Sequence, residues 1–169
     1  MLRRLTLRLF TGFLIGHLSL AVPPISSAQV IKSGPPACPG VALTFDLCET
    51  AGEIAGYDGA IVDELRRRKV PATFFAGGHW VLTHPGRFGE IASDPLFEVG
   101  NHTWTHANLR TVDDARLKTE VLAPEAAFHA AVAGPLCPRP EAIAPTKRST
   151  LFRFPFGACD ARSMAAVND

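Results

Sequence analysis

The sequence lacks several features that would assign it to a common class. Its four cysteines include no Cys-x-x-Cys spacing, which argues against a structural zinc knuckle. It has no basic patch interleaved with aromatic residues, and its formal net charge is only +1, so nothing favours a nucleic-acid partner. We also find no internal repeat and no low-complexity segment. The 169 residues therefore suit one domain with a sizeable core.

The N-terminus differs in composition from the rest of the chain. Three arginines precede an apolar run over residues 9–22, and the small residues Ser26 and Ala28 lie just before Gln29. This order is typical of a secretory signal peptide, which we predict over residues 1–28. The alternative is an uncleaved membrane anchor, although the run is short for a spanning helix. No second stretch could span a bilayer, so the mature protein is expected to be secreted or periplasmic, with no membrane attachment.

Strand-like and helix-like patterns alternate after an extended lead-in over residues 29–40. Short apolar runs predict strands at residues 41–45, 72–76, 97–99 and 150–154. Helical patterns cover residues 57–69, 87–93, 112–133 and 160–167, with a break or kink expected at Pro124. The alternation predicts an α/β fold with a mostly parallel sheet covered on both faces.

Three polar motifs follow predicted strands, where α/β folds place their chemistry. They are Thr44-Phe45-Asp46, then Asn101-His102-Thr103 with His106, then Arg153-Phe154-Pro155-Phe156-Gly157. If the second motif is helical, His102 and His106 lie four residues apart on one face and can bind a divalent cation together. The alternative is a chance spacing of two histidines.

The three motifs, in this order and spacing, resemble the first motifs of the polysaccharide deacetylases, the NodB-homology family of carbohydrate esterases. The resemblance runs from about residue 41 to residue 169. It implies an irregular (β/α) barrel that removes acetyl groups from acetylated polysaccharides with one divalent metal ion, for which zinc is the expected identity. It also implies that Asp46 is the catalytic base, that Arg153 holds this base by an ion pair, and that His102 and His106 bind the metal. In the third motif we expect Phe154, Pro155, Phe156 and Gly157 to bind substrate, with one phenylalanine lining the groove and the other packed inside.

The chain departs from the family pattern in two places. Leu47 replaces the aspartate that binds the metal in the family, so we expect Glu49 as the substitute ligand. Alternatively, Asp46 itself moves onto the metal. The family's later motifs, including a histidine general acid, have no match after Gly157, so we expect a barrel that is incomplete at its C-terminal end. The favoured substrates are chitooligosaccharides or N-acetylglucosamine polymers, with peptidoglycan, xylan, exopolysaccharides and O-acetylated chains left open. A carbohydrate-binding relic with impaired catalysis is the alternative.

The cysteines suit an oxidising compartment. If Asp46 and Arg153 form an ion pair, their neighbours Cys48 and Cys159 lie on adjacent loops, and we predict a disulfide between them. Cys38 and Cys137 form the second predicted pair. The alternative is four free thiols.

Overall fold

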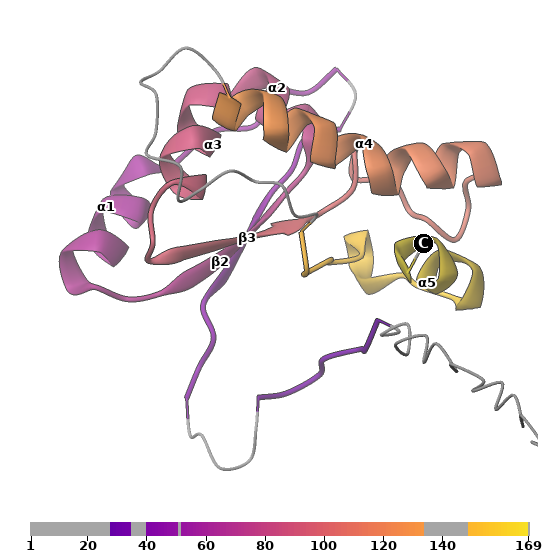
Figure 1. The fold of residues 1–169 in the computed structure, drawn as a ribbon, viewed down its shortest axis with the longest axis horizontal. Coiled ribbons are helices and arrows are strands. Elements are labelled where there is room, and N and C mark those ends of the chain that lie inside the picture. Colours follow the sequence, from indigo (N-terminus) through magenta and orange to yellow (C-terminus); the bar gives the residue numbers. More distant parts are fainter. Residues whose placement is uncertain (1–27, 35–39, 51, 134–148, 169) are drawn as a thin grey trace, which may run out of the picture.

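A parallel sheet forms the centre of the fold. The computed structural model describes residues 28–34, 40–50, 52–133 and 149–168. Strands β1 (Thr44–Leu47), β2 (Ala72–Ala76) and β3 (Phe97–Asn101) pair in parallel in the order β1-β2-β3, and a parallel bridge joins Asn101 to Phe152 (Figure 1). The predicted α/β fold with a parallel sheet is thus confirmed. The strands seen in the described part of the chain do not close a barrel.

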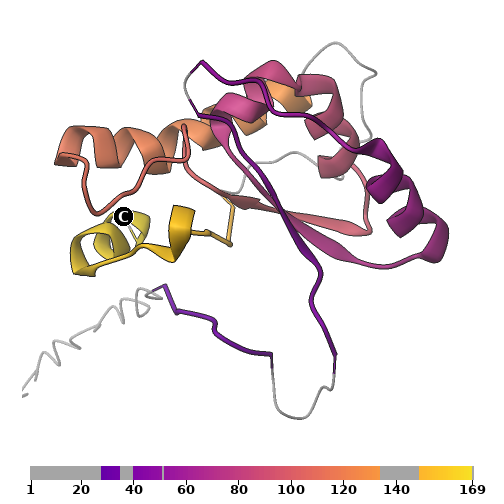
Figure 2. The same cartoon turned by 180° about the vertical axis from the view of Figure 1, so that it is seen from behind.

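Helices connect the strands and cover the sheet. They are α1 (Gly59–Arg68), α2 (Gly78–Thr83), α3 (Pro85–Ala92), α4 (Asp114–Ala133) and α5 (Ala161–Asn168), with a short 3-10 turn η2 (Pro155–Gly157). Figures 1 and 2 show α1, α2, α3 and α4 along one side of the sheet, while α5 lies below α4. Among the described residues, no helix has the length and apolar character needed to cross a membrane.

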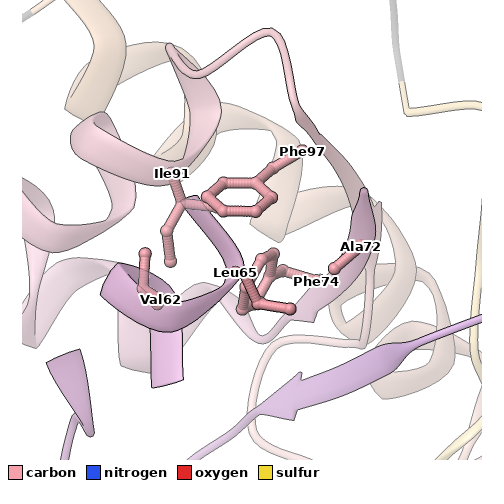
Figure 3. Packing of buried hydrophobic residues seen from close by; sticks show 6 residues of the cluster. All are labelled: Val62, Leu65, Ala72, Phe74, Ile91 and Phe97. Carbon is pink, nitrogen blue, oxygen red and sulfur yellow. The ribbon is translucent and has the colours of Figure 1, made fainter. Parts of the chain in front are cut away.

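One hydrophobic cluster packs α1 and α3 against the sheet. Figure 3 shows its six buried members, which are Val62, Leu65, Ala72, Phe74, Ile91 and Phe97. The Phe74 ring contacts Phe97 edge-on at a centroid distance of 5.1 Å and stacks on Phe45 at 5.2 Å. Burying one large apolar side chain contributes roughly 1.5–3 kcal/mol, so this cluster stabilises the packing of α1 and α3 on the sheet.

The first strand begins later than predicted. It starts at Thr44 rather than at residue 41, and Val41 is 89% exposed. The partner strand β2 begins only after Pro71, and its Thr73 pairs with Thr44, so the residues before Leu43 have no strand to bond. In the described residues β1 is an edge strand, and Thr44 and Asp46 on one of its faces are exposed, so it is not covered on both faces.

Helix α2 was not predicted, and it lies between the strand predicted at residues 72–76 and the helix predicted at residues 87–93. Gly78 is the first residue of this helix, and a Cβ atom there would lie 2.2 Å from Cε3 of Trp104. The glycine therefore permits close packing rather than a turn.

Three further predictions differ from the structure or fall outside it. The strand predicted at residues 150–154 is reduced to the single bridge at Phe152. Helix α4 continues through the buried Pro124 in one element, and Asn101 Nδ2 donates to the nearby Val121 carbonyl at 3.0 Å. The lead-in has no helix or strand in residues 29–34 or at residue 40, while residues 1–27 and 35–39 lie outside the described residues.

Candidate active site

Three distant segments meet at the carboxyl end of the sheet. Asp46 lies in β1, and His102 follows β3 directly. The backbone of Asn101 accepts from Arg153 N at 2.9 Å and donates to Leu151 O at 2.8 Å, which brings the third motif beside the second. His102 N donates to Ala76 O at 3.0 Å and thereby ties the second motif to β2. The parallel arrangement thus assembles the three motifs predicted from the sequence.

The expected ion pair between Asp46 and Arg153 is present. Arg153 Nη1 lies 2.7 Å from Asp46 Oδ1, and Nη2 donates to Thr44 Oγ1 at 3.0 Å. The guanidinium lies over the Phe75 ring, 4.0 Å from its centroid. A Cβ atom at Gly100 would lie 2.6 Å from Cδ1 and Cε1 of the same ring, so the glycine leaves the space that Phe75 occupies beneath Arg153.

His102 is buried, and one of its ring nitrogens has no hydrogen-bond partner. Only 1% of the residue is exposed. Its Nδ1 lies 2.8 Å from the Arg153 carbonyl, which can only accept, so Nδ1 carries the proton and Nε2 presents a lone pair. Nε2 is buried without a hydrogen bond, 3.8 Å from Asp46 Oδ2. Burial lowers the pKa of His102 and so favours the neutral ring that metals bind.

His106 and Cys48 complete a group of potential metal ligands with His102. One ligand atom from each lies within 4.8 Å of the other two, and this is the one such group of three or more found among the described residues. The two imidazole rings have a centroid distance of 5.0 Å. Neutral imidazole nitrogens beside a thiol suit zinc, and the unpartnered Nε2 of His102 is an orphaned polar atom that a metal would satisfy. The residues present therefore fit a divalent ion.

The two histidines converge through a loop and not through the predicted helix. Thr103 and His106 have left-handed backbone conformations, with φ of 69° and 58°. Such values are uncommon for residues other than glycine and mark local strain that the surroundings must offset. The segment leaves β3 and turns back at once to contact α2, since Thr103 O and Trp104 O accept from Gly78 N and His79 N.

Glu120 holds this loop in place, and sequence reasoning missed it. Its fully buried carboxylate accepts from Trp104 N at 2.9 Å, from Thr105 N at 2.8 Å and from Thr105 Oγ1 at 2.6 Å. Arg116 Nε also donates to it, at 2.8 Å. The one signal available in the sequence was an acidic residue between Leu117 and Val121 on the apolar side of α4.

Asn101 supports the same loop from inside. It is buried, its Nδ2 donates to Val121 O and to Glu125 Oε1, and its Oδ1 accepts from Thr103 N at 2.9 Å. The Asn-His-Thr sequence at residues 101–103 has the pattern of an N-glycosylation site. Because the Asn101 amide is buried and hydrogen-bonded within the turn, it cannot accept a glycan.

The structure corrects the expected role of Glu49. Its buried carboxylate accepts from Ala55 N and Thr83 Oγ1, each at 2.9 Å, and lies 3.1 Å from His79 Nδ1. It does not belong to the group formed with His102 and His106. The carboxylate points toward α2, where it closes the loop after β1.

The predicted disulfide between Cys48 and Cys159 is not formed, because both cysteines are free thiols. Cys48 joins the histidines, whereas Cys159 is exposed beyond η2. Burial and the neighbouring carboxylates of Asp46, Glu53 and Glu49 raise the pKa of the Cys48 thiol. The predicted partners Cys38 and Cys137 lie outside the described residues.

The third motif divides between the core and the exposed surface beside His106. Phe154 packs against the cluster of Leu109, Leu117 and Val121, and Pro155 is buried. Phe156 is 71% exposed, with its ring centroid 4.7 Å from that of His106. Its φ of 60° is followed by a φ of 63° at Gly157, so a strained turn presents the ring beside the histidine.

Comparisons with known proteins agree with this geometry. Residues 33–169 match the polysaccharide deacetylase family. A chitooligosaccharide deacetylase of Rhizobium leguminosarum bv. trifolii is 37% identical over 79 residues, which are 47% of this chain and 34% of that protein. A peptidoglycan-N-acetylglucosamine deacetylase of Bacillus cereus is 33% identical over 93 residues, which are 55% of this chain and 32% of that protein.

A solved structure extends the likeness to the fold. A family 4 carbohydrate esterase from Bacillus anthracis is 27% identical with a TM-score of 0.56, over 74% of this chain and 52% of that chain. The chain thus spans about a third of the length of the two curated relatives and about half that of the solved structure.

Proposed function

The chain belongs to the polysaccharide deacetylase family, and from this premise we propose that it removes acetyl groups from N-acetylated sugar polymers in a metal-dependent reaction. The observation that carries the proposal is the buried, unpartnered Nε2 of His102, which lies 3.8 Å from a carboxylate oxygen of Asp46. A lone pair with no partner beside a carboxylate is the arrangement expected of a metal ligand next to a general base.

His102 and His106 would hold the ion. When bound, a divalent metal supplies Lewis acidity, which polarises the acetyl carbonyl and makes water a stronger nucleophile at neutral pH. The hydrogen bond from His102 Nδ1 to the Arg153 carbonyl fixes the tautomer that directs Nε2 into the site. Burial of this ring keeps it neutral and excludes competing hydrogen-bond donors.

Asp46 would take the proton from the attacking water. Arg153 binds Oδ1, which leaves Oδ2 facing His102 Nε2. The carboxylate side chain is 39% exposed, so a proton that it accepts can pass on to solvent. The fixed orientation serves the requirement that a base lie within hydrogen-bond reach of the proton that it removes.

Phe156 would contact the sugar. Its ring is exposed next to His106, whereas Phe154 and Pro155 are turned into the protein. An exposed aromatic face beside the reacting group is a suitable surface for a pyranose ring. The related proteins favour chitooligosaccharides or the N-acetylglucosamine units of peptidoglycan as substrates.

The protein would act outside the cytoplasm. The predicted signal peptide over residues 1–28 supports export, and peptidoglycan lies outside the cell membrane. Fractionation of cells that express the full chain, with N-terminal sequencing of the exported form, tests both export and cleavage before Gln29.

Acetate release from N-acetylglucosamine oligomers and from peptidoglycan, with zinc and after chelation, tests the proposal. We expect Asp46→Asn to lower kcat by about 10²–10⁴-fold without loss of bound metal, because only the base is removed. Asp63→Asn, an exposed change on α1, is the matched control. Loss of metal together with activity in Asp46→Asn would make Asp46 a ligand instead. Carbohydrate binding with no acetate release from the intact chain would favour the alternative, a binding protein of the same fold.

A further inference from the structure

The structure places a cysteine where the family pattern has lost its carboxylate. Leu47 cannot coordinate a metal, and its side chain packs against two hydrophobic clusters. Its carbonyl accepts from Gly77 N at 2.7 Å, which fixes the chain at the end of β1. Side chains alternate along an extended segment, so Asp46 and Cys48 emerge on the side opposite to Leu47.

Cys48 lies where a third ligand is needed. Its sulfur and one nitrogen from each of His102 and His106 are within 4.8 Å of one another. Ligand atoms that share one tetrahedral zinc lie about 3–4 Å apart, given bonds of about 2.0–2.3 Å. Closure by about 1 Å would therefore complete the site. The unpartnered, buried Nε2 of His102 is independent evidence that this point accepts a ligand.

The loop that carries Cys48 is anchored by the neighbouring residue, Glu49. The neighbouring Glu49 is buried and bonded to Ala55 N, Thr83 Oγ1 and His79. These contacts direct the Glu49 carboxylate toward α2 and away from His102 and His106, and they hold the adjacent thiol on the side of those two histidines. Glu49 is thus a positioning residue and not a ligand.

We infer, on the basis of the proposed function, that Cys48 binds the metal as a thiolate and completes a Cys-His-His site. The thiol loses its proton to solvent when the sulfur–metal bond forms. A thiolate has the same single negative charge as the missing aspartate, so the net charge of the ligand set is preserved. The soft sulfur selects zinc, and cobalt as its spectroscopic substitute, over magnesium, calcium or manganese.

Cobalt titration of the full chain tests this ligand directly. Because a thiolate bound to Co²⁺ gives an intense near-ultraviolet charge-transfer band, we expect this band in the wild type and in Cys159→Ser, and its loss in Cys48→Ser. His102→Ala should also lose it. A band that persists in Cys48→Ser, cobalt bound without any such band, or no cobalt binding would overturn the inference.

Alkylation of the same samples gives a second readout with an internal control. Zinc should slow iodoacetamide modification of Cys48 at least tenfold, while the exposed Cys159 reacts at the same rate with and without zinc. Equal rates at Cys48 with and without zinc would overturn the inference. Acetate release separates the failure of one proposal from the failure of the other. Zinc-dependent turnover without protection of Cys48 would support the deacetylase activity and contradict the Cys48 ligand. Protection of Cys48 without turnover would support the metal site and contradict the activity.

Discussion

The proposed metal ligands and the proposed base lie side by side at the carboxyl end of the sheet, but the protein supports them differently. The proposed ligands Cys48, His102 and His106 form the metal half, in which His102 is almost fully buried and its loop is fixed by the buried Glu120. Asp46 and Arg153 form the base half, with side chains 39% and 35% exposed. Asp46 lies in the edge strand β1, whereas Arg153 follows the bridge that Phe152 forms with the end of β3. Coordination needs fixed donors, whereas a base must exchange protons with water.

The largest expected effect comes from breaking the support of the metal half. Glu120→Ala leaves the partly buried Trp104 and Thr105 amides without an acceptor, so we expect a loss of about 3 kcal/mol in the free energy of unfolding. Urea denaturation measures this loss. Glu64→Ala, on the exposed side of α1, should change stability by less than about 0.5 kcal/mol.

Glu120→Gln keeps the folded loop accessible to measurement if the alanine variant unfolds. It should bind zinc more weakly than the wild type, because its single amide oxygen can accept from the two backbone donors but no second oxygen remains for Thr105 Oγ1 and Arg116 Nε. Unchanged stability in the alanine variant and unchanged zinc affinity in the glutamine variant would together show that Glu120 does not organise the loop.

A smaller loss should follow from crowding the same loop. A Cβ atom in Gly78→Ala would collide with Trp104, so α2 or the loop must shift at a cost of about 1–3 kcal/mol. Gly86→Ala is the matched control in α3, because nothing lies within 4 Å of a Cβ atom there. It should be neutral or stabilising by up to about 1 kcal/mol. Thermal melts of the two variants that coincide would contradict the packing argument.

Arg153 contacts the metal half through its backbone and the base half through its side chain. Its carbonyl accepts from His102, while its guanidinium binds Asp46 and Thr44. Arg153→Lys keeps the backbone contact but cannot make both side-chain contacts, so kcat should fall about tenfold with zinc affinity unchanged. A parallel loss of zinc binding would show that the halves are not independent. The melting temperature should barely change, because the ion pair is more than one-third exposed.

The smallest effect concerns acid stability away from both halves. Arg66 donates to Asp94 at 2.7 Å and lowers the pKa of that carboxyl. The resulting stabilisation is present above the unfolded pKa of about 4 and is lost as the pH falls through the lower folded value. Comparison of wild type with Asp94→Asn should show a difference below about 1 kcal/mol at pH 7 that shrinks toward pH 3. A difference independent of pH would assign it to packing.

Periodicity and motif order predicted the parallel sheet and the meeting of the three motifs, because these depend on local patterns and on a fixed rule for parallel strands. The details of the site depended on tertiary contacts that no local pattern contains. The approach of His102 to His106 uses left-handed residues in a loop, and the support of that loop comes from Glu120 on a distant helix. Glu49 was predicted to be a ligand because a carboxylate can bind a metal. The direction of its side chain depends on contacts with α2, a helix that the sequence did not predict.

Cys48 shows the same limit from the other side. The sequence predicted that the loops of Cys48 and Cys159 lie close together, and this proximity favoured a disulfide over a metal ligand. The folded chain instead brings its sulfur beside His102 and His106, a contact that no local sequence pattern contains.

Gly100 has a consequence for how the site can change during evolution. Because Phe75 rests against this glycine and Arg153 rests on Phe75, the backbone of β3 sets the height of the guanidinium above the sheet. An added methyl group at position 100 would be transmitted through the aromatic ring to the orientation of Asp46, without touching any polar atom. The tolerance of the site to substitution is therefore limited by a position that carries no side chain, and a search for functional groups would overlook it.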